Sequence, residues 1–237
     1  MQKIFITFGS GSEDYNAACD RLVSQANRCQ IFDKVIGFKM EDLKQDLVFW
    51  NQHSEFIQNN PRGIGYWVWK PYLILKTLYN MSDGDVLIYA DSGCEIDVRK
   101  RNNILYMIEN ICQTEHIIAS FCDTEKKWVK KDIIEYLNVD NNIYLDTPQR
   151  QASSICIKKT YLTYSLVNEW YTACCNYHLI DDSPSISQNY DCFVENRHDQ
   201  SIFSLLTKRY NLGNNVSLDG FAINIARNRT GKSRLNQ

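Results

Sequence analysis

The sequence predicts one α/β domain with a central, mostly parallel sheet flanked by helices. Short apolar runs such as Lys3–Phe8 alternate with longer amphipathic segments over the first half of the chain, as expected for strands and helices in turn. The chain has 237 residues, of which 44% are hydrophobic, so one sizeable core can form. No internal repeat, low-complexity tract or linker interrupts it. We expect a Rossmann-like domain over residues 1–225 and a basic tail over residues 226–237.

The first four elements are predicted by apolar runs and the breaks between them. Lys3–Phe8 is a short strand that meets a tight loop at Gly9. Residues 14–27 predict a helix. Residues 33–38 are rich in β-forming side chains and predict a second strand, and residues 40–57 are amphipathic and predict a second helix.

The next stretch predicts a loop, a helix and a central strand. Residues 61–66 contain two glycines that permit unusual backbone angles. Pro71 suits the first turn of a helix, which we expect to run to residue 81. Residues 85–90 are apolar and predict a buried strand, which ends abruptly at Asp91.

In the second half the alternation of strand and helix is weaker. The expected elements are helix 100–112, strand 116–121, helix 131–137, strand 153–157, helix 159–175, an irregular stretch over 180–197 and helix 200–210.

The composition excludes several classes of protein. The chain carries 26 basic and 28 acidic residues, a net charge of −2, which does not favour a nucleic-acid binder. Its nine cysteines are an odd number and form no Cys-x-x-Cys pair, so we expect free thiols in a reducing compartment. No secretory leader and no membrane-spanning run stands out. We therefore expect a cytoplasmic protein.

The basic tail has two interpretations. It carries Arg227, Arg229, Lys232 and Arg234. It is either a solvated, frayed end or a peripheral contact with an anionic membrane face.

One pair of neighbouring segments carries most of the functional information. The first, residues 62–71, reads Arg-Gly-Ile-Gly-Tyr-Trp-Val-Trp-Lys-Pro, and the second, residues 83–93, reads Asp-Gly-Asp-Val-Leu-Ile-Tyr-Ala-Asp-Ser-Gly. Asp91 therefore stands at the carboxyl end of a buried strand, where α/β sheets hold metals or phosphate-bearing ligands. The alternative is that Asp91 only caps a turn.

The side chains of the first segment suit a phosphorylated ligand. Lys70 and Arg62 could bind a diphosphate, and Trp67 or Trp69 could stack on a base or a sugar. In an extended stretch the two tryptophans would share one face, opposite Lys70. The alternative is that one or both indoles pack beneath the following helix.

These two segments resemble the donor-binding region of nucleotide-sugar glycosyltransferases with the GT-A fold. The match is closest to a group from bacterial polysaccharide loci and large DNA viruses that carries Trp-x-Trp-Lys-Pro and a strand end with Asp-x-Gly. In GT-A enzymes such a strand ends in Asp-x-Asp. Here Tyr89-Ala-Asp-Ser-Gly93 holds one acid only, so either Tyr89 replaces the first aspartate or Gly93 replaces the second.

The resemblance implies a GT-A-like domain, a nucleoside-diphosphate sugar donor with UDP favoured, a glycan or glycoconjugate acceptor, and Mn²⁺ or Mg²⁺. It places the donor nucleotide, its sugar and the metal near several residues. These are Thr7, Phe8, Gly9, Tyr89, Ala90, Asp91, Arg150 and Gln151.

A third feature is Arg197-His-Asp-Gln-Ser201, which precedes the last helix. The resemblance implies that His198 joins Asp91 at the metal, or that His198 and Asp199 orient an acceptor hydroxyl. An inverting transferase also needs a carboxylate base, for which Asp199 is the first candidate and Asp191 the second. The alternative is that Asp199 only caps the helix.

The predicted function is transfer of a sugar from a nucleoside-diphosphate sugar to a hydroxyl group, assisted by a metal ion. Two alternatives remain. One is a catalytically inactive nucleotide- or sugar-binding module, because the second acid is missing. The other is a sugar-phosphate nucleotidylyltransferase, although the loop after the first strand lacks the cations that such an enzyme needs.

Overall fold

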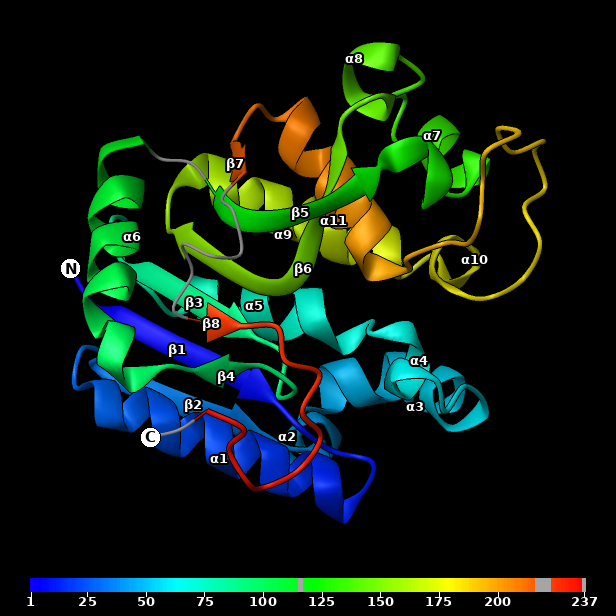
Figure 1. The fold of residues 1–237 in the computed structure, drawn as a ribbon. Coiled ribbons are helices and arrows are strands. Elements are labelled where there is room, and N and C mark those ends of the chain that lie inside the picture. Colours follow the sequence, from blue (N-terminus) through cyan, green and yellow to red (C-terminus); the bar gives the residue numbers. More distant parts are fainter. Residues whose placement is uncertain (115–116, 216–222, 236–237) are drawn as a thin grey trace.

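The computed structural model describes residues 1–114, 117–215 and 223–235, and the predicted α/β architecture is confirmed (Figure 1). Within the described residues a six-stranded sheet has the order β2-β1-β3-β6-β5-β7. The strands are β1 (Lys3–Phe8), β2 (Lys34–Phe38), β3 (Val86–Ala90), β5 (Ile117–Thr124), β6 (Pro148–Lys158) and β7 (Gly213–Asn215). All pairings are parallel except the two made by β6, which runs against both β3 and β5.

Helices cover both faces of this sheet (Figure 1). The helices are α1 (Glu13–Cys29), α2 (Met40–Gln45), α3 (Leu47–Asn59), α4 (Gly63–Tyr66), α5 (Trp69–Tyr79), α6 (Arg101–Thr114), α7 (Lys131–Tyr136), α8 (Asn142–Leu145), α9 (Tyr161–Cys174), α10 (Tyr177–Ile180) and α11 (Asp199–Arg209), with short 3₁₀ turns η1 (Val98–Lys100) and η2 (Glu125–Lys127). A second, two-stranded sheet pairs β4 (Glu95–Ile96) with β8 (Ile223–Asn224).

The alternation of side chains along β1 divides the core in two. Ile4, Ile6 and Phe8 face a large cluster that includes the buried side chains of α5, α9 and α11. Phe5 points to the opposite face, where a smaller cluster joins α1 and α6. Both faces of the central strands are therefore buried, which explains why their sequences are apolar throughout rather than alternating.

Most predicted elements are present, with three differences. The helix expected over 40–57 is broken at Asp46 (φ −82°, ψ 91°), whose carboxylate caps α3 and accepts hydrogen bonds from Tyr72 and Lys76. β6 begins at Pro148, five residues earlier than expected. β4, β7, β8, α4, α8 and α10 were not predicted because each is only two to four residues long, and α4 falls in the stretch expected to be a loop. His116, the first residue of the strand expected over 116–121, lies outside the described residues.

The nine cysteines are free thiols, as predicted. No helix of the described residues is both long enough and apolar enough to span a membrane. The basic tail does not extend into solvent as a frayed end. Residues 226–235 are instead folded against α1 and β4 (Figure 1).

Candidate active site

A pocket of about 820 Å³ opens at the carboxyl ends of β1 and β3. Phe8 and Gly9 end the first of these strands, and Asp91 follows the second. Because β6 runs antiparallel, its early residues Gln151 and Ser153 reach the same edge of the sheet. The pocket therefore lies where parallel α/β sheets bind ligands.

One wall of the pocket is a turn of left-handed helix. The five residues 63–67 all have positive φ, at 59°, 56°, 74°, 49° and 63°. Three of them are not glycine, and such backbone costs roughly 1–2 kcal/mol for each non-glycine residue. The indole of Trp67 lies directly over Gly63, where a Cβ atom would come within 2.5 Å of the ring. The Nε1 of Trp69 donates to the Gly63 carbonyl at 2.9 Å.

This turn corrects the prediction that Trp67 and Trp69 share one face of an extended stretch. The chain reverses at Trp67 and enters α5 at Trp69, which is 5% exposed and packs on Phe8. Both indoles line the pocket, and Lys70 enters it from the first turn of α5.

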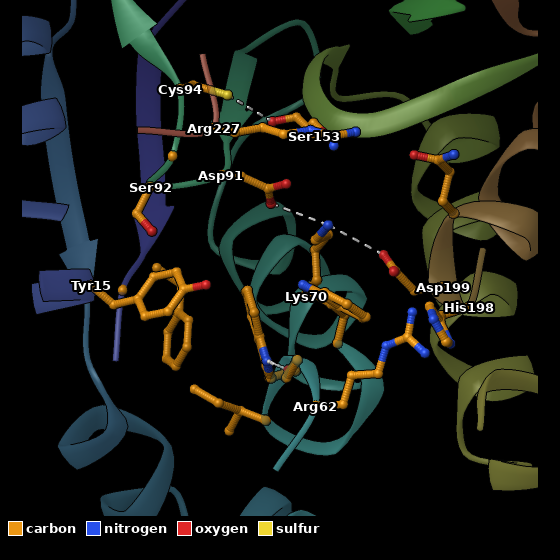
Figure 2. Close-up of a pocket in the computed structure, with 18 of the residues that line it drawn as sticks. Tyr15, Arg62, Lys70, Asp91, Ser92, Cys94, Ser153, His198, Asp199 and Arg227 are labelled. Atoms are coloured by element: carbon orange, nitrogen blue, oxygen red, sulfur yellow. Dashed lines mark hydrogen bonds and ion pairs between the residues drawn. The ribbon is translucent and has the colours of Figure 1, made fainter. Parts of the chain in front are cut away.

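The ammonium of Lys70 lies between two carboxylates (Figure 2). Its Nζ is 3.1 Å from Asp91 Oδ1 and 3.4 Å from Asp199 Oδ2, and it donates to the Ala152 carbonyl at 3.3 Å. Burial alone would lower the pKa of Lys70, but the two carboxylates outweigh burial and raise it. The two carboxylates therefore favour the charged form of Lys70, which is 3% exposed at the floor of the pocket.

Asp91 and Asp199 differ in their surroundings. The Asp91 side chain is 31% exposed and also accepts a hydrogen bond of 2.5 Å from Tyr89. The Asp199 side chain is 4% exposed, and its burial, opposed by Lys70, raises its pKa to about 7. Its Oδ2 has no hydrogen-bond partner within the described residues, although it faces the Lys70 charge. Asp199 is the first residue of α11, and its carboxylate serves this ion pair rather than only a helix cap.

His198 is held in a strained backbone conformation (φ 56°, ψ −128°) immediately before α11. Its Nδ1 donates to the Ile180 carbonyl at 2.7 Å, and its ring stacks on Tyr66 and lies beside Trp67. Burial lowers the pKa of His198, so its ring is neutral and Nε2 carries a lone pair. No hydrogen-bond partner for this buried Nε2 exists among the described residues.

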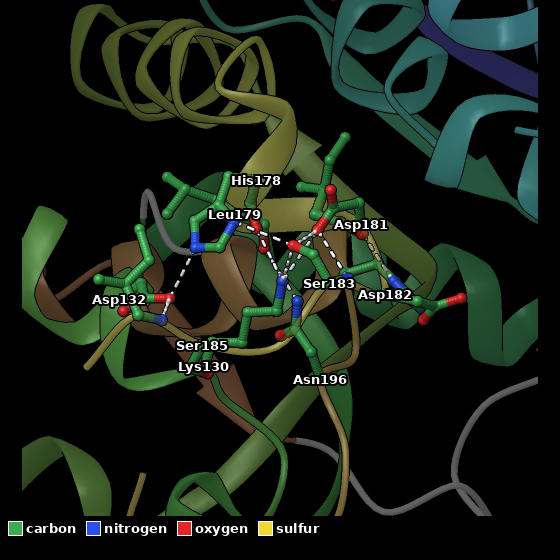
Figure 3. A network of polar contacts seen from close by, with 12 residues as sticks. Lys130, Asp132, His178, Leu179, Asp181, Asp182, Ser183, Ser185 and Asn196 are labelled. Carbon is green, nitrogen blue, oxygen red and sulfur yellow. Dashed lines mark hydrogen bonds and ion pairs between the residues drawn. The ribbon is translucent and has the colours of Figure 1, made fainter. Parts of the chain in front are cut away.

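A polar network fixes the irregular segment 181–198, which ends at His198 beside the pocket (Figure 3). Lys130 is 2% exposed, and its Nζ donates to the His178 carbonyl at 2.7 Å and to Asp181 at 3.0 Å. The His178 ring bridges Asp132 and Ser183 at 2.8 and 2.9 Å. The stretch has no regular structure, as predicted, but it is fixed in place.

The two ends of the pocket carry different side chains. At one end Tyr15, Arg227 and Arg229 line the wall, beside the loop Ser92-Gly93. At the other end the guanidinium of Arg197 stacks on the Trp128 ring, with 4.1 Å between the Cζ atom and the ring centroid. Each end of the pocket therefore combines arginine side chains with an aromatic ring.

The residues present do not fit the predicted divalent metal. Lys70 Nζ pairs with Asp91 Oδ1 at 3.1 Å, and the Tyr89 hydroxyl donates to the same oxygen. His198 contacts Tyr66, Trp67 and Ile180, and it forms no cluster with Asp91. Among the described residues no group of three His, Cys, Asp or Glu side chains could hold a metal ion. Asp91 and His198 therefore do not come together as a metal site among these residues, and their role as metal ligands stays a prediction.

Nine of the predicted site residues line the pocket together. They are Phe8, Gly9, Arg62, Trp67, Lys70, Asp91, Gln151, His198 and Asp199. Arg62 is at the rim, where its guanidinium pairs with both oxygens of Asp182 at 2.8 and 2.9 Å.

The other five predicted residues lie outside the lining, each for a local reason. The Thr7, Tyr89 and Ala90 side chains are buried within the sheet layer. Arg150 faces away from the pocket, because its guanidinium donates to Thr207 Oγ1 at 2.8 Å and to the Gly213 carbonyl at 2.6 Å. Asp191 is exposed on the irregular segment. Neither residue is part of the pocket lining, so the roles expected for Arg150 in donor binding and for Asp191 as a base stay predictions without support from this arrangement.

Several lining residues were not predicted as site residues. Trp128 and Arg197 approach from segments about seventy residues apart in the chain. Arg197 opens the motif singled out before the last helix, but no role was predicted for it, and no local pattern marks Trp128. Arg227 and Arg229 were recognised only as parts of a basic tail. The clustering of basic residues near the end of the chain could have marked these two arginines as candidate ligand-binding residues. Their position near Asp91 depends on the fold.

Comparisons with known proteins give distant similarities only. No protein-family model and no curated protein matches the chain. Among solved structures the chain is similar to mouse xyloside xylosyltransferase 1 in its apo form, with 11% identity, coverage of 91% of this chain and 85% of that one, and a TM-score of 0.49. It is also similar to the galactosyltransferase LgtC in complex with donor and acceptor sugar analogues, with 13% identity, coverage of 86% and 70%, and a TM-score of 0.46. Both likenesses are too distant to indicate a reaction or a substrate.

Proposed function

We propose that this protein is a glycosyltransferase that moves a sugar from a nucleoside-diphosphate sugar to a hydroxyl group of a glycan or glycoconjugate, with UDP as the favoured nucleotide. The observation that carries the proposal is the buried Asp91–Lys70–Asp199 array at the floor of a large pocket. Such an array places a fixed cation and a carboxylate of raised pKa side by side, where a leaving phosphate and an attacking hydroxyl would both need partners.

The size and lining of the pocket support a nucleotide-sugar donor. A cavity of about 820 Å³ is in the upper part of the range typical of small-molecule sites. The end formed by Phe8, Gly9 and Tyr15 offers aromatic rings against which a base could pack. The adjoining Asp91 carboxylate is partly exposed and can accept hydrogen bonds from ribose hydroxyls.

The reaction requires one bond to form and one to break at the anomeric carbon of the donor sugar. The acceptor oxygen bonds to this carbon, while the bond from the carbon to the β-phosphate oxygen breaks and leaves a nucleoside diphosphate. The hydroxyl proton passes to Asp199, whose raised pKa suits a base that works near neutral pH. His198 Nε2, which has no partner among the described residues, can accept a hydrogen bond from a hydroxyl of the bound sugar or acceptor.

Lys70 and the pocket walls position these groups. The Lys70 ammonium keeps the two carboxylates apart and faces the negative charge that develops on the departing phosphate. The Trp128–Arg197 stack at the far end offers an apolar face and a cation for the acceptor. Since the residues present do not fit a metal ion, no step of this proposal passes through one.

The test is release of nucleoside diphosphate from a panel of UDP-sugars, followed by product analysis with simple glycan acceptors. We expect UDP release from at least one donor, and an increase when the correct acceptor is added. Release that persists in Asp199→Asn at the wild-type rate would contradict the assigned base. Tight UDP binding without turnover of any donor would favour a nucleotide-binding module, and the absence of all nucleotide binding would exclude both functions.

A further inference from the structure

The C-terminal segment, residues 226–235, is built into the wall of the pocket. Its Asn228 backbone N–H donates to the Gly93 carbonyl at 2.9 Å. Arg21 of α1, 7% exposed, reaches between the two stretches of chain and donates to the carbonyls of Ser92 and Cys94 at 2.9 Å and of Asn228 at 3.2 Å. One guanidinium therefore joins the C-terminal segment to the loop that follows Asp91.

A buried carboxylate makes the second attachment. Glu95 is fully buried and accepts hydrogen bonds from Asn228 Nδ2 at 2.6 Å, from Ser233 Oγ at 2.6 Å and from the Arg234 N–H at 3.0 Å. Burial raises the pKa of Glu95, but the hydrogen bonds from Ser233 and Asn228 outweigh burial and lower it, so Glu95 is ionised. A carboxylate with this many donors holds the segment more firmly than surface contacts could.

The attachments leave two arginines of this segment at the pocket. Arg227 and Arg229 both line it and both are exposed. Within the described residues no ion pair involves either guanidinium, and that of Arg229 lies over the ring of Tyr15, 5.5 Å from its centroid. Two cationic side chains at the mouth of a pocket, with no ion pair to any described residue, favour an anionic ligand.

The other cations of the pocket already have partners. Lys70 is paired with Asp91 and Asp199, and Arg62 with Asp182. Arg197 stacks on Trp128 and pairs with Glu195 at 3.2 Å. Charge available for a new anion is therefore concentrated at the end of the pocket that adjoins Gly93.

From this placement we infer that Arg227 and Arg229 bind the diphosphate of the donor and supply the positive charge that a divalent cation would otherwise supply. Arginine forms bidentate hydrogen bonds with phosphate oxygens, and two guanidinium groups can offset most of the charge of a nucleoside diphosphate. The inference rests on the proposed function, and it makes donor binding independent of metal.

The experiment is calorimetric titration of the full chain with UDP, in EDTA and then in Mn²⁺ or Mg²⁺. The variants are Arg227→Gln and Arg229→Gln. The matched control is Lys232→Gln, which removes one positive charge from the same segment at an exposed position outside the pocket lining. We expect the Kd of the wild type to be the same in EDTA as in metal. Each arginine variant should weaken UDP binding about tenfold (~1.4 kcal/mol) and reduce its salt dependence, and the control should not.

Two results would overturn the inference while leaving the proposed function intact. One is UDP binding that EDTA weakens more than about tenfold. The other is UDP binding by Arg227→Gln and Arg229→Gln that equals that of Lys232→Gln. Thermal unfolding of each variant shows whether the fold is retained, since exposed arginines should be replaceable without loss of stability. If UDP, GDP, CDP and dTDP all fail to bind in any condition, the proposed function fails as well.

Discussion

The Lys70 ammonium and the Asp199 carboxylate lie 3.4 Å apart, and each side chain is only 4% exposed. Removing two charges from water is costly, and the attraction between them compensates only when both are present. The raised pKa of Asp199 reflects part of this cost, while Asp91, which is partly exposed, also stabilises the ammonium. Burying the charges of Lys70 and Asp199 therefore costs folding stability, while the same charges serve the proposed reaction.

Removing the lysine tests this cost. Lys70→Met should destabilise the fold by about 3–5 kcal/mol, because Asp199 is left as an unpaired buried carboxylate. The double variant Lys70→Met/Asp199→Leu should recover much of that loss, since an apolar pair can replace a buried ion pair, but it should have no transferase activity. Urea unfolding measures both. Equal stability of Lys70→Met and the wild type would show that the pair is not buried in solution.

Asp91 should be important for transfer and less important for folding. Its side chain is 31% exposed, so Asp91→Ala leaves no large cavity. We expect near-native thermal unfolding and a loss of transfer of at least about a hundredfold, equivalent to ~2.7 kcal/mol. Asp20→Ala, an exposed surface change on α1, is the control. Severe unfolding of Asp91→Ala alone would instead assign a structural role to this carboxylate.

The pH dependence of turnover should report Asp199. A base must be ionised, so kcat/KM should rise with pH, with an apparent pKa of about 7, and level off above it. The contribution of Asp199 to folding stability changes with pH in the opposite direction to turnover, because it falls as pH rises. Because the folded-state pKa is raised above the unfolded value of about 3.9, this contribution is complete below pH ~4 and is lost as pH rises through about 7.

The variant Asp199→Asn tests whether the pH dependence of kcat/KM comes from the Asp199 carboxyl or from another titratable group. It should abolish the acid limb of the profile and lower turnover, while UDP binding is retained. His198 cannot supply the same limb, because burial lowers its pKa below the usual range. An acid limb near pH 7 that persists in Asp199→Asn would move the role of base to another group.

Gly63 should be a sensitive position in the pocket wall. Gly63→Ala introduces a Cβ atom 2.5 Å from the Trp67 ring, at a residue with φ of +59°. We expect a loss of stability of about 1–3 kcal/mol and weaker UDP binding, since the indole must move. Gly84→Ala is the matched control, because its φ is also positive (+90°) but no atom lies within 4 Å of the added Cβ. Equal effects of the two changes would show that backbone strain alone, not the indole contact, is responsible.

Much of the fold and part of the site could be predicted from local pattern. The residues of β1 and β3 form apolar runs bounded by turns, so the ends of these strands, and with them Gly9 and Asp91, follow from the local sequence. Lys70 is expected near Asp91 because α5 leads directly into β3. These features depend on neighbours in sequence, which is why the sequence reveals them.

The remaining features depend on contacts between distant segments. The family resemblance placed Arg150 at the donor, but its guanidinium donates instead to Thr207 Oγ1 and to the Gly213 carbonyl. The ion pair between the strand-end acid Asp91 and Lys70 likewise follows from the packed side chains and not from the local sequence.

By itself, then, the sequence determined the α/β class, the central strands and the position of Asp91, because periodicity and turn residues act over a few neighbours. Tertiary structure alone decided that Asp199 pairs with Lys70, 129 residues away, and that Arg21 and Glu95 bring Arg227 to the pocket. These contacts form only when the whole core has packed, since buried charges find their partners through the fold and not along the chain.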